Sequence, residues 1–162
     1  MSSQSVSTLS PTAAAAKAKP QAAEADQSAL RSGIVLLGRT LFAFIFLLAG
    51  VFHFSAPEIA YAAHQGLPFA GFLVPASGLL AAAGGLSILL GYRAKIGAWL
   101  LVLFLVPVTL TMHNFWAVKD PMMAQMQMVM FMKNASILGG ALVISQLGAG
   151  PLSLDARRNR RR

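Results

Sequence analysis

The sequence predicts an all-α integral membrane protein, an antiparallel four-helix bundle preceded by a disordered N-terminal tail. Of its 162 residues, 56% are apolar and only 11% are charged, whereas soluble domains carry about 25% charged residues. Four apolar segments of about 20 residues follow one another, and this length spans the hydrocarbon of a bilayer. The polar breaks between them are short, and short connections make neighbouring helices antiparallel.

The first unit is the tail of residues 1–30, which is rich in Ala, Ser, Gln and Pro and almost free of bulky apolar side chains. A segment of this composition cannot bury enough apolar surface to offset the entropy of ordering, so we expect disorder. Its alanine run at 13–16 is too short for the apolar core of a signal peptide. We therefore expect no cleaved secretory signal.

The membrane domain follows over residues 31–155, with spans predicted at about 33–54, 69–90, 96–116 and 122–147. The breaks carry turn-forming or charged residues: 55–68 holds two prolines, 91–95 two basic residues, and 117–121 ends in Asp120-Pro121. Small residues at four-residue spacing let helices approach closely in lipid. They lie at Ser77, Ala81 and Gly85 and at Ser136 and Gly140. This spacing fits packing within one chain and a homo-oligomer equally well.

The charge pattern predicts the orientation of the bundle. The net charge is +8, and the tail of residues 156–162 alone carries five arginines. A basic cluster directly after a span is typical of an anchor on anionic lipid headgroups, so we expect the lipid bilayer as a partner and no nucleic acid. The N-terminal flank and the 91–95 loop are also basic, and positive flanks stay in the cytoplasm. The sequence therefore predicts a multi-pass protein with both termini cytoplasmic.

Two cations, Arg39 and Lys133, lie inside the predicted spans, and no Asp or Glu lies within any span to pair with them. A charge near the bilayer centre costs about 3 kcal/mol, so such residues tend to face a cavity, a partner or a ligand. The two cations can lie at similar depth, which suggests one shared site. The alternatives are that their side chains extend to the headgroups or bond to backbone carbonyls freed by Pro75 or Pro107.

Further side chains complete the candidate ligand-binding site. At 100° per residue, the face of Arg39 also carries Phe46 and His53. The remaining candidates are His113 and Asn114 after the Pro107 bend, Asn134 beside Lys133, and Glu58, His64 and Asp120 at the outer mouth. Two opposed imidazoles suggest haem or metal, but no His pair has ligand spacing within one helix and no carboxylate supports them, so we expect no metal. An interfacial His more commonly bonds to headgroups, water or a neighbouring helix. The pattern identifies no catalytic residue.

Two features of composition limit the chemistry. Six methionines lie between positions 122 and 132, a pattern typical of lipid-facing or core packing and, alternatively, of a wall that adapts to a flexible apolar ligand. The chain has no cysteine, which excludes thiolate catalysis and cysteine-ligated metal centres. Any redox role would therefore require a bound or diffusible cofactor.

Several short motifs follow one another in a specific order. They are Gly38-Arg39, FLLAG at 46–50, GGLSILLGYR at 84–93, MHNFW at 112–116 with Asp120-Pro121, FMKN at 131–134, and GAGPLSLD at 148–155. Together they resemble the DoxX family of small four-helix membrane proteins over residues 33–155. The resemblance implies an inner (cytoplasmic) membrane protein and relatives among the membrane subunits of thiosulfate:quinone oxidoreductases. Many members place a Glu near 75–77, which this chain lacks, so a proton relay is not carried over.

Three functions follow from these observations. The first is a redox-associated subunit, an oxidoreductase component if it is enzymatic, that binds a quinone or similar amphipathic ligand within the bundle and works with a redox partner protein. The unpaired cations motivate it, because they can donate to a quinone carbonyl. The second is a small-anion transporter or binding protein that acts as a dimer. The third is a non-catalytic scaffold for partner proteins, which the lack of a complete catalytic set favours.

Overall fold

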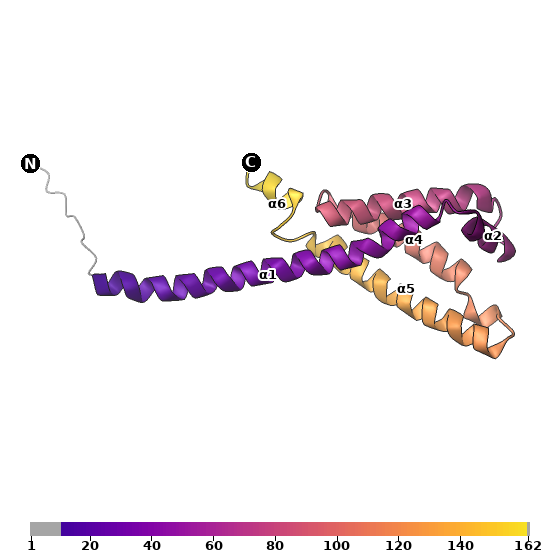
Figure 1. Cartoon of the computed structure of the whole chain (residues 1–162), viewed down its shortest axis with the longest axis horizontal. Coiled ribbons are helices and arrows are strands. Elements are labelled where there is room, and N and C mark those ends of the chain that lie inside the picture. Colours follow the sequence, from indigo (N-terminus) through magenta and orange to yellow (C-terminus); the bar gives the residue numbers. More distant parts are fainter. Residues whose placement is uncertain (1–10, 162) are drawn as a thin grey trace, which may run out of the picture.

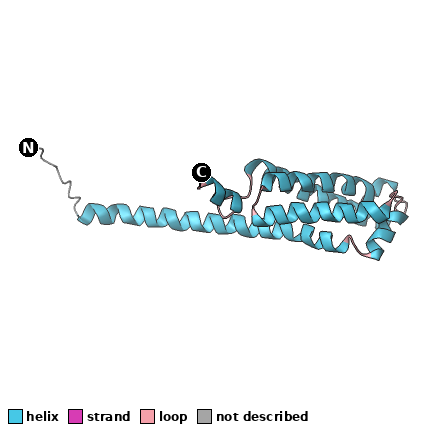
Figure 2. Cartoon of the chain, turned by 90° about the horizontal axis from the view of Figure 1, so that it is seen from above, coloured by secondary structure: helices cyan, strands magenta, loops and turns pink. Residues whose placement is uncertain are grey.

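The computed structural model describes residues 11–161 of the protein, and its side chains from Glu24 onward. The elements are α1 (Pro11–Phe52), α2 (Ala56–His64), α3 (Ala70–Leu90), α4 (Ala94–Met112), the 3-10 helix η1 (Phe115–Ala117), α5 (Pro121–Leu147) and α6 (Leu154–Asn159). Every regular element within 11–161 is helical (Figure 2). Four stretches are long and apolar enough to cross a membrane: Glu24–Phe52, Ala70–Leu90, Ala94–Ala117 and Pro121–Leu147. The predicted all-α membrane bundle is confirmed.

Helix α1 extends well beyond the bundle toward the N-terminus (Figure 1). It begins at Pro11, so its first turns lie in the segment for which the sequence predicts disorder. Alanine has the highest helix propensity, and a span that is already helical removes the cost of nucleation for the residues that precede it. For residues 1–10 the predicted disorder lies outside the described part of the chain.

Consecutive spans pack as neighbours, α1 on α3, α3 on α4 and α4 on α5. Glycines allow the closest approaches: a Cβ added at Gly78 would lie 2.6 Å from His53 Cβ, and one added at Gly84 would lie 2.6 Å from Leu101 Cδ2. In lipid, where burial of apolar surface does not drive helices together, such close packing supplies the attraction. The small-residue face predicted on the second span is confirmed, because Ala81 is fully buried between the helices.

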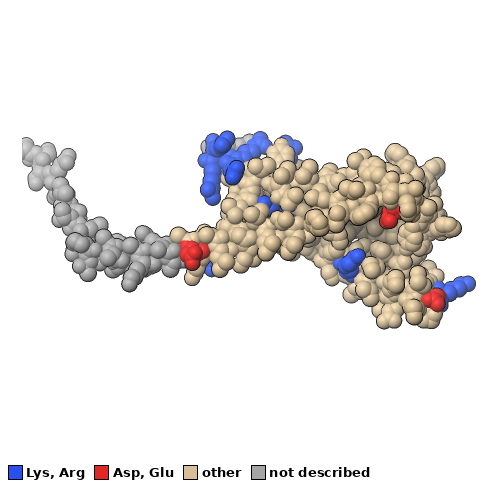
Figure 3. Space-filling view, in the orientation of Figure 1, with Lys and Arg blue, Asp and Glu red and all other residues tan. Residues whose placement is uncertain are grey.

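Two ends of the bundle differ in character. The end that we call the basic end carries the loop between α3 and α4 and the arginine-bearing α6, and Figure 3 shows basic side chains gathered there. The opposite end, the α2 end, carries α2 and η1. There α5 begins with Pro121 behind Asp120, whose carboxylate accepts a hydrogen bond from Met123 N at 2.8 Å, an arrangement that satisfies an orphan amide of the first turn.

The fourth side of the bundle is open. At the basic half, α5 meets α1 closely enough that a Cβ added at Gly140 would lie 2.9 Å from the ring of Phe42. From there α5 diverges from α1 toward the α2 end (Figure 1). The aromatic side chains of Phe115 and Trp116 in η1 pack edge-on against Phe131 of α5, with ring centroids 5.6 and 5.9 Å apart. This cluster fixes α5 to the end of α4 rather than to α1.

Candidate functional site

A cavity of about 540 Å³ lies in the half of the bundle nearest the α2 end. It lies between α1 and α5, because Ile45 and Ala49 of α1 and Asn134 and Ile137 of α5 line the same space. Figure 3 shows a hollow in the surface between α5 and the rest of the bundle, with acidic and basic side chains at an otherwise uncharged face. The volume is within the range of small-molecule sites, about 300–1,000 Å³.

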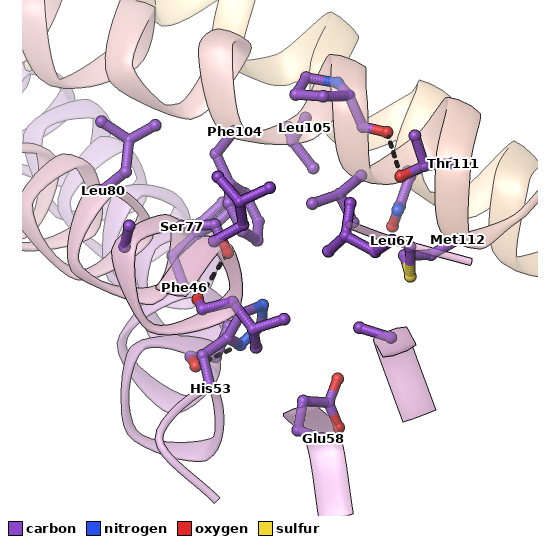
Figure 4. Close-up of a pocket in the computed structure, with 18 of the residues that line it drawn as sticks. Phe46, His53, Glu58, Leu67, Ser77, Leu80, Phe104, Leu105, Thr111 and Met112 are labelled. Atoms are coloured by element: carbon purple, nitrogen blue, oxygen red, sulfur yellow. Dashed lines mark hydrogen bonds between the residues drawn. The ribbon is translucent and has the colours of Figure 1, made fainter. Parts of the chain in front are cut away.

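The cavity has an apolar interior and a polar mouth. Figure 4 shows Phe46, Leu80, Phe104 and Leu105 around the open centre and the carboxylate of Glu58 at its edge. Phe46 and Phe104 are 2% and 6% exposed and pack edge to face with centroids 6.2 Å apart. Two lining hydroxyls are already satisfied, because Ser77 donates to Val74 O at 2.8 Å and Thr111 to Pro107 O at 2.7 Å. The interior therefore presents a largely apolar surface.

A chain of hydrogen bonds closes the mouth from three elements. His113, after α4, pairs through Nδ1 with Gln127 Oε1 of α5 at 2.8 Å, and Gln127 Nε2 donates to the Tyr61 hydroxyl of α2 at 3.1 Å. Gln65 Nε2 also donates to the Tyr61 hydroxyl, at 3.0 Å. Since the hydroxyl oxygen accepts two hydrogen bonds, its own proton remains available to a ligand or to water.

His53 contributes an acceptor. Its Nδ1 lies 2.7 Å from Ala49 O, one turn earlier in α1. A carbonyl can only accept, so Nδ1 carries the proton and Nε2 of the neutral ring is an acceptor. The ring stands edge-on to Phe104, with centroids 5.6 Å apart, which fixes its orientation at the cavity wall.

Asn134 is the least exposed polar residue that lines the cavity. The residue is 8% exposed and lines the cavity. Among the described residues, no hydrogen bond satisfies its side-chain amide. Gln127 lies two turns earlier on the same face and is 9% exposed, so the two side chains form a polar stripe on one side of α5. The amide is not among the fully buried atoms without a partner, so it is open to the cavity and can form hydrogen bonds to a ligand there.

Arg39 lies at the basic end, away from this cavity. Its Nη1 donates to Ala149 O at 2.7 Å and its Nη2 to Leu152 O at 2.8 Å, while its Nε is buried without a partner in the described part of the chain. The guanidinium also lies against Gly91, where an added Cβ would be 3.0 Å from Nη1. Both α3 and α5 end beside it, and the negative ends of their dipoles favour a cation.

The structure thus gives Arg39 backbone carbonyls as partners, although not those freed by Pro75 or Pro107. It also separates the two intramembrane cations. Lys133 lies 14 residues before the C-terminal end of α5, about 21 Å along the helix, whereas Arg39 contacts residues beyond that end. The single site expected for both cations is not formed, because the C-terminal segment packs back against α1 and its carbonyls accept the hydrogen bonds of Arg39.

The segment 148–155 is a latch that holds the basic end together. The Asp155 carboxylate accepts from Arg93 N at 2.9 Å and Ala94 N at 3.1 Å, and so satisfies the first amides of α4. Asp155 N in turn donates to Gly91 O at 2.9 Å. The motif ending in this aspartate therefore has a structural explanation, since it caps a helix that has no capping side chain of its own.

The other predicted site residues fall into two groups, those that line the cavity and those that lie elsewhere. Phe46, His53, Glu58 and His113 line the cavity together with Asn134. Asn114 precedes η1 without a capping bond, His64 is exposed at the end of α2, and Asp120 caps α5. The side chain of Lys133 is exposed. No cluster of three metal-ligating side chains occurs among the described residues. Tyr61 is not among the predicted site residues, and its place in the mouth follows from the formation of α2.

Comparison with known proteins gives one family. A family model described as the SURF4 family matches residues 18–161. The inner membrane protein YqjF of Escherichia coli (strain K12) is 31% identical over 129 residues, which are 78% of this chain and 93% of that protein. The ER-derived vesicles protein ERV29 of Saccharomyces cerevisiae is 31% identical over 75 residues, 46% of this chain but only 24% of that protein. No solved structure matches.

These matches overturn the resemblance to the DoxX family, because the family model that covers the membrane domain is a different one. The redox-associated, quinone-binding subunit inferred with it is wrong for the same reason, and neither alternative function is better matched. The motifs behind the resemblance have structural roles here: GLSILLGYR ends α3 at Gly91, and GAGPLSLD forms the latch. Short runs that make helix ends are a weak basis for distinguishing families of four-helix membrane proteins.

Proposed function

The chain belongs to the SURF4 family, whose model covers residues 18–161, and from this premise we propose that it is a membrane-embedded binding protein. It holds a ligand with an apolar body and a hydrogen-bonding head non-covalently in the cavity between α1 and α5. The single observation that carries the proposal is Asn134, which is 8% exposed, makes no side-chain hydrogen bond within the described residues and lines a cavity with a largely apolar interior. The polar head of a ligand can bond to this amide while its apolar body packs against the interior of the cavity.

The chemistry of the mouth fits the same ligand. Acceptors converge there from Glu58 and His53, and the Tyr61 hydroxyl offers a proton. An apolar body would occupy the space beside Phe46 and Phe104, where it gains van der Waals contacts with the lining side chains. Binding sites of this kind combine an apolar lining with few convergent polar groups.

The protein is a multi-pass membrane protein with four apolar helices. Its similarity to a protein named for the inner membrane supports a location in the corresponding membrane here. We place the basic end on the cytoplasmic side, because Arg93, Lys95 and the arginines of α6 belong to it. The mouth of the cavity then faces the opposite side.

The test is photolabelling of the purified full chain in lipid nanodiscs. The probe is a diazirine-bearing alkyl chain with a primary hydroxyl head, and the labelled residues are mapped by mass spectrometry. We expect labels on Phe46, Phe104 and Ile137 that an excess of the unlabelled alcohol displaces. The variant Asn134→Leu should weaken binding about 2- to 10-fold, the equivalent of one hydrogen bond of about 0.5–1.5 kcal/mol.

The matched control is Ser136→Leu, which changes a polar residue to leucine at an exposed position of the same helix. It should leave labelling of the cavity unchanged. Labels that spread evenly over lipid-facing residues, or a cavity signal that competitor does not reduce, would refute the proposal.

A further inference from the structure

Lys133 lies in the middle of α5, and the structure gives its charge no adequate partner. It is 12 residues after Pro121 and 14 before Leu147, about 18 and 21 Å along the helix from the two ends. Its Nζ donates to Met130 Sδ at 3.3 Å, and a thioether is a weak acceptor. Because the side chain is exposed and too far from either end to extend to the headgroups, its charge would face hydrocarbon at a cost of about 3 kcal/mol.

Lys133 lies beside the opening between α1 and α5, which no described helix of this chain fills. It directly precedes Asn134, which lines the cavity, so it stands at the rim of the space between α1 and α5. This is the side on which the two helices diverge (Figure 1) and the surface is hollowed (Figure 3). Met126 and Val129 lie on the same stripe and are exposed. Methionine side chains adapt their shape to a neighbour, as a helix-packing surface requires.

None of the chain's carboxylates lies in the middle of a membrane-spanning helix, and none forms an ion pair with Lys133 in the described part of the chain. The described acidic residues lie toward the N-terminal extension, in α2, at the start of α5 or in the latch: Glu24, Asp26, Glu58, Asp120 and Asp155. A second copy related by an axis normal to the bilayer presents its residues at the same depths, so it cannot place a carboxylate opposite Lys133 either. The counter-charge must come from a different molecule.

We propose that Lys133 forms an ion pair with an Asp or Glu in the middle of a transmembrane helix of another protein, which packs along α5 in the opening between α1 and α5. An acidic residue in a membrane span is as costly alone as the lysine, so the pair relieves both. The partner helix would supply the missing side wall of the cavity. This inference does not depend on the identity of the cavity ligand.

The experiment is photo-crosslinking in native membranes from a photoreactive amino acid at Val129, one turn from Lys133. We expect an adduct with one other membrane protein, whose crosslinked peptide belongs to a span that contains an Asp or Glu. Lys133→Met should reduce the adduct at least tenfold while the protein stays folded, because it removes an unpaired charge from the bilayer. There are two controls. Lys119→Met changes an exposed lysine outside the spans and should not reduce the adduct. A photoreactive residue at Val143 should not form it.

The decisive arm is a charge exchange. Lys133→Glu should abolish the adduct, and a partner whose acidic residue is changed to lysine should restore it. The proposal is overturned by an adduct with a second copy of this chain, by adducts with lipid only, by a partner span without an acidic residue, or by no adduct. It is equally overturned if Lys133→Met leaves the adduct at its original level.

Discussion

Replacing Arg39 with methionine removes the two hydrogen bonds that hold the 148–155 latch against α1. The bonds run from Nη1 to Ala149 O at 2.7 Å and from Nη2 to Leu152 O at 2.8 Å. Hydrogen bonds from a charged group contribute about 1.5–3 kcal/mol each, so the pair contributes about 3–6 kcal/mol. Part of this is offset, because the variant no longer desolvates a cation. We expect a net loss of about 2–4 kcal/mol in docking of the latch.

Hydrogen exchange measured by mass spectrometry in nanodiscs tests this value. The reporting amide is Asp155 N, which donates to Gly91 O at 2.9 Å only while the latch is docked. Since 1.4 kcal/mol corresponds to a factor of ten, its protection should fall roughly 30- to 700-fold when exchange reports local opening. Arg31→Met replaces an exposed arginine of the same helix and should change nothing. Unaltered protection in Arg39→Met would show that the guanidinium does not hold the latch.

Three further substitutions test the rest of the structure. Asp155→Asn removes the carboxylate that accepts from Arg93 N and Ala94 N and should lower stability by about 1 kcal/mol in thermal unfolding, whereas Asp26→Asn should have no effect. Gly78→Ala places a Cβ 2.6 Å from His53 Cβ and should cost about 1–3 kcal/mol by separating α1 from α3; Gly71→Ala, with nothing within 4 Å, is its control, and equal melting temperatures for the two would contradict the close packing. Tyr61→Phe leaves the 9%-exposed Gln127 without its α2 partner, and we expect a loss of about 1–3 kcal/mol with faster exchange in α2 while α3 keeps its protection.

The four membrane spans could be predicted from the sequence, because the length and hydropathy of the segments are enough to identify them. The inward stripe of Arg39, Phe46 and His53 on α1 follows from helical periodicity and is present. Helix α2 was not predicted, because its segment contains two prolines and has the composition of a loop. One of these prolines, Pro57, lies in the first turn of α2, where proline does not disrupt a helix.

The partner of Arg39 was beyond reach from sequence. The absence of acids in the spans pointed to a partner other than a carboxylate side chain, but the carbonyls of Ala149 and Leu152 come from a segment whose path depends on Gly91 and Asp155. Similarly, Tyr61 joins the cavity mouth only because α2 folds back over α3. Contacts between segments far apart in the chain leave no local pattern to read.

The most direct test of the proposed binding function is the identity of small molecules released from the protein purified from its own membrane. Native mass spectrometry should detect an amphipathic molecule bound one to one in the wild type. Ala49→Phe fills the cavity from α1 and should abolish its retention, whereas Ala60→Phe, at an exposed position of α2, should retain it. The same complement of bound molecules in the wild type and in Ala49→Phe would contradict a ligand site between α1 and α5.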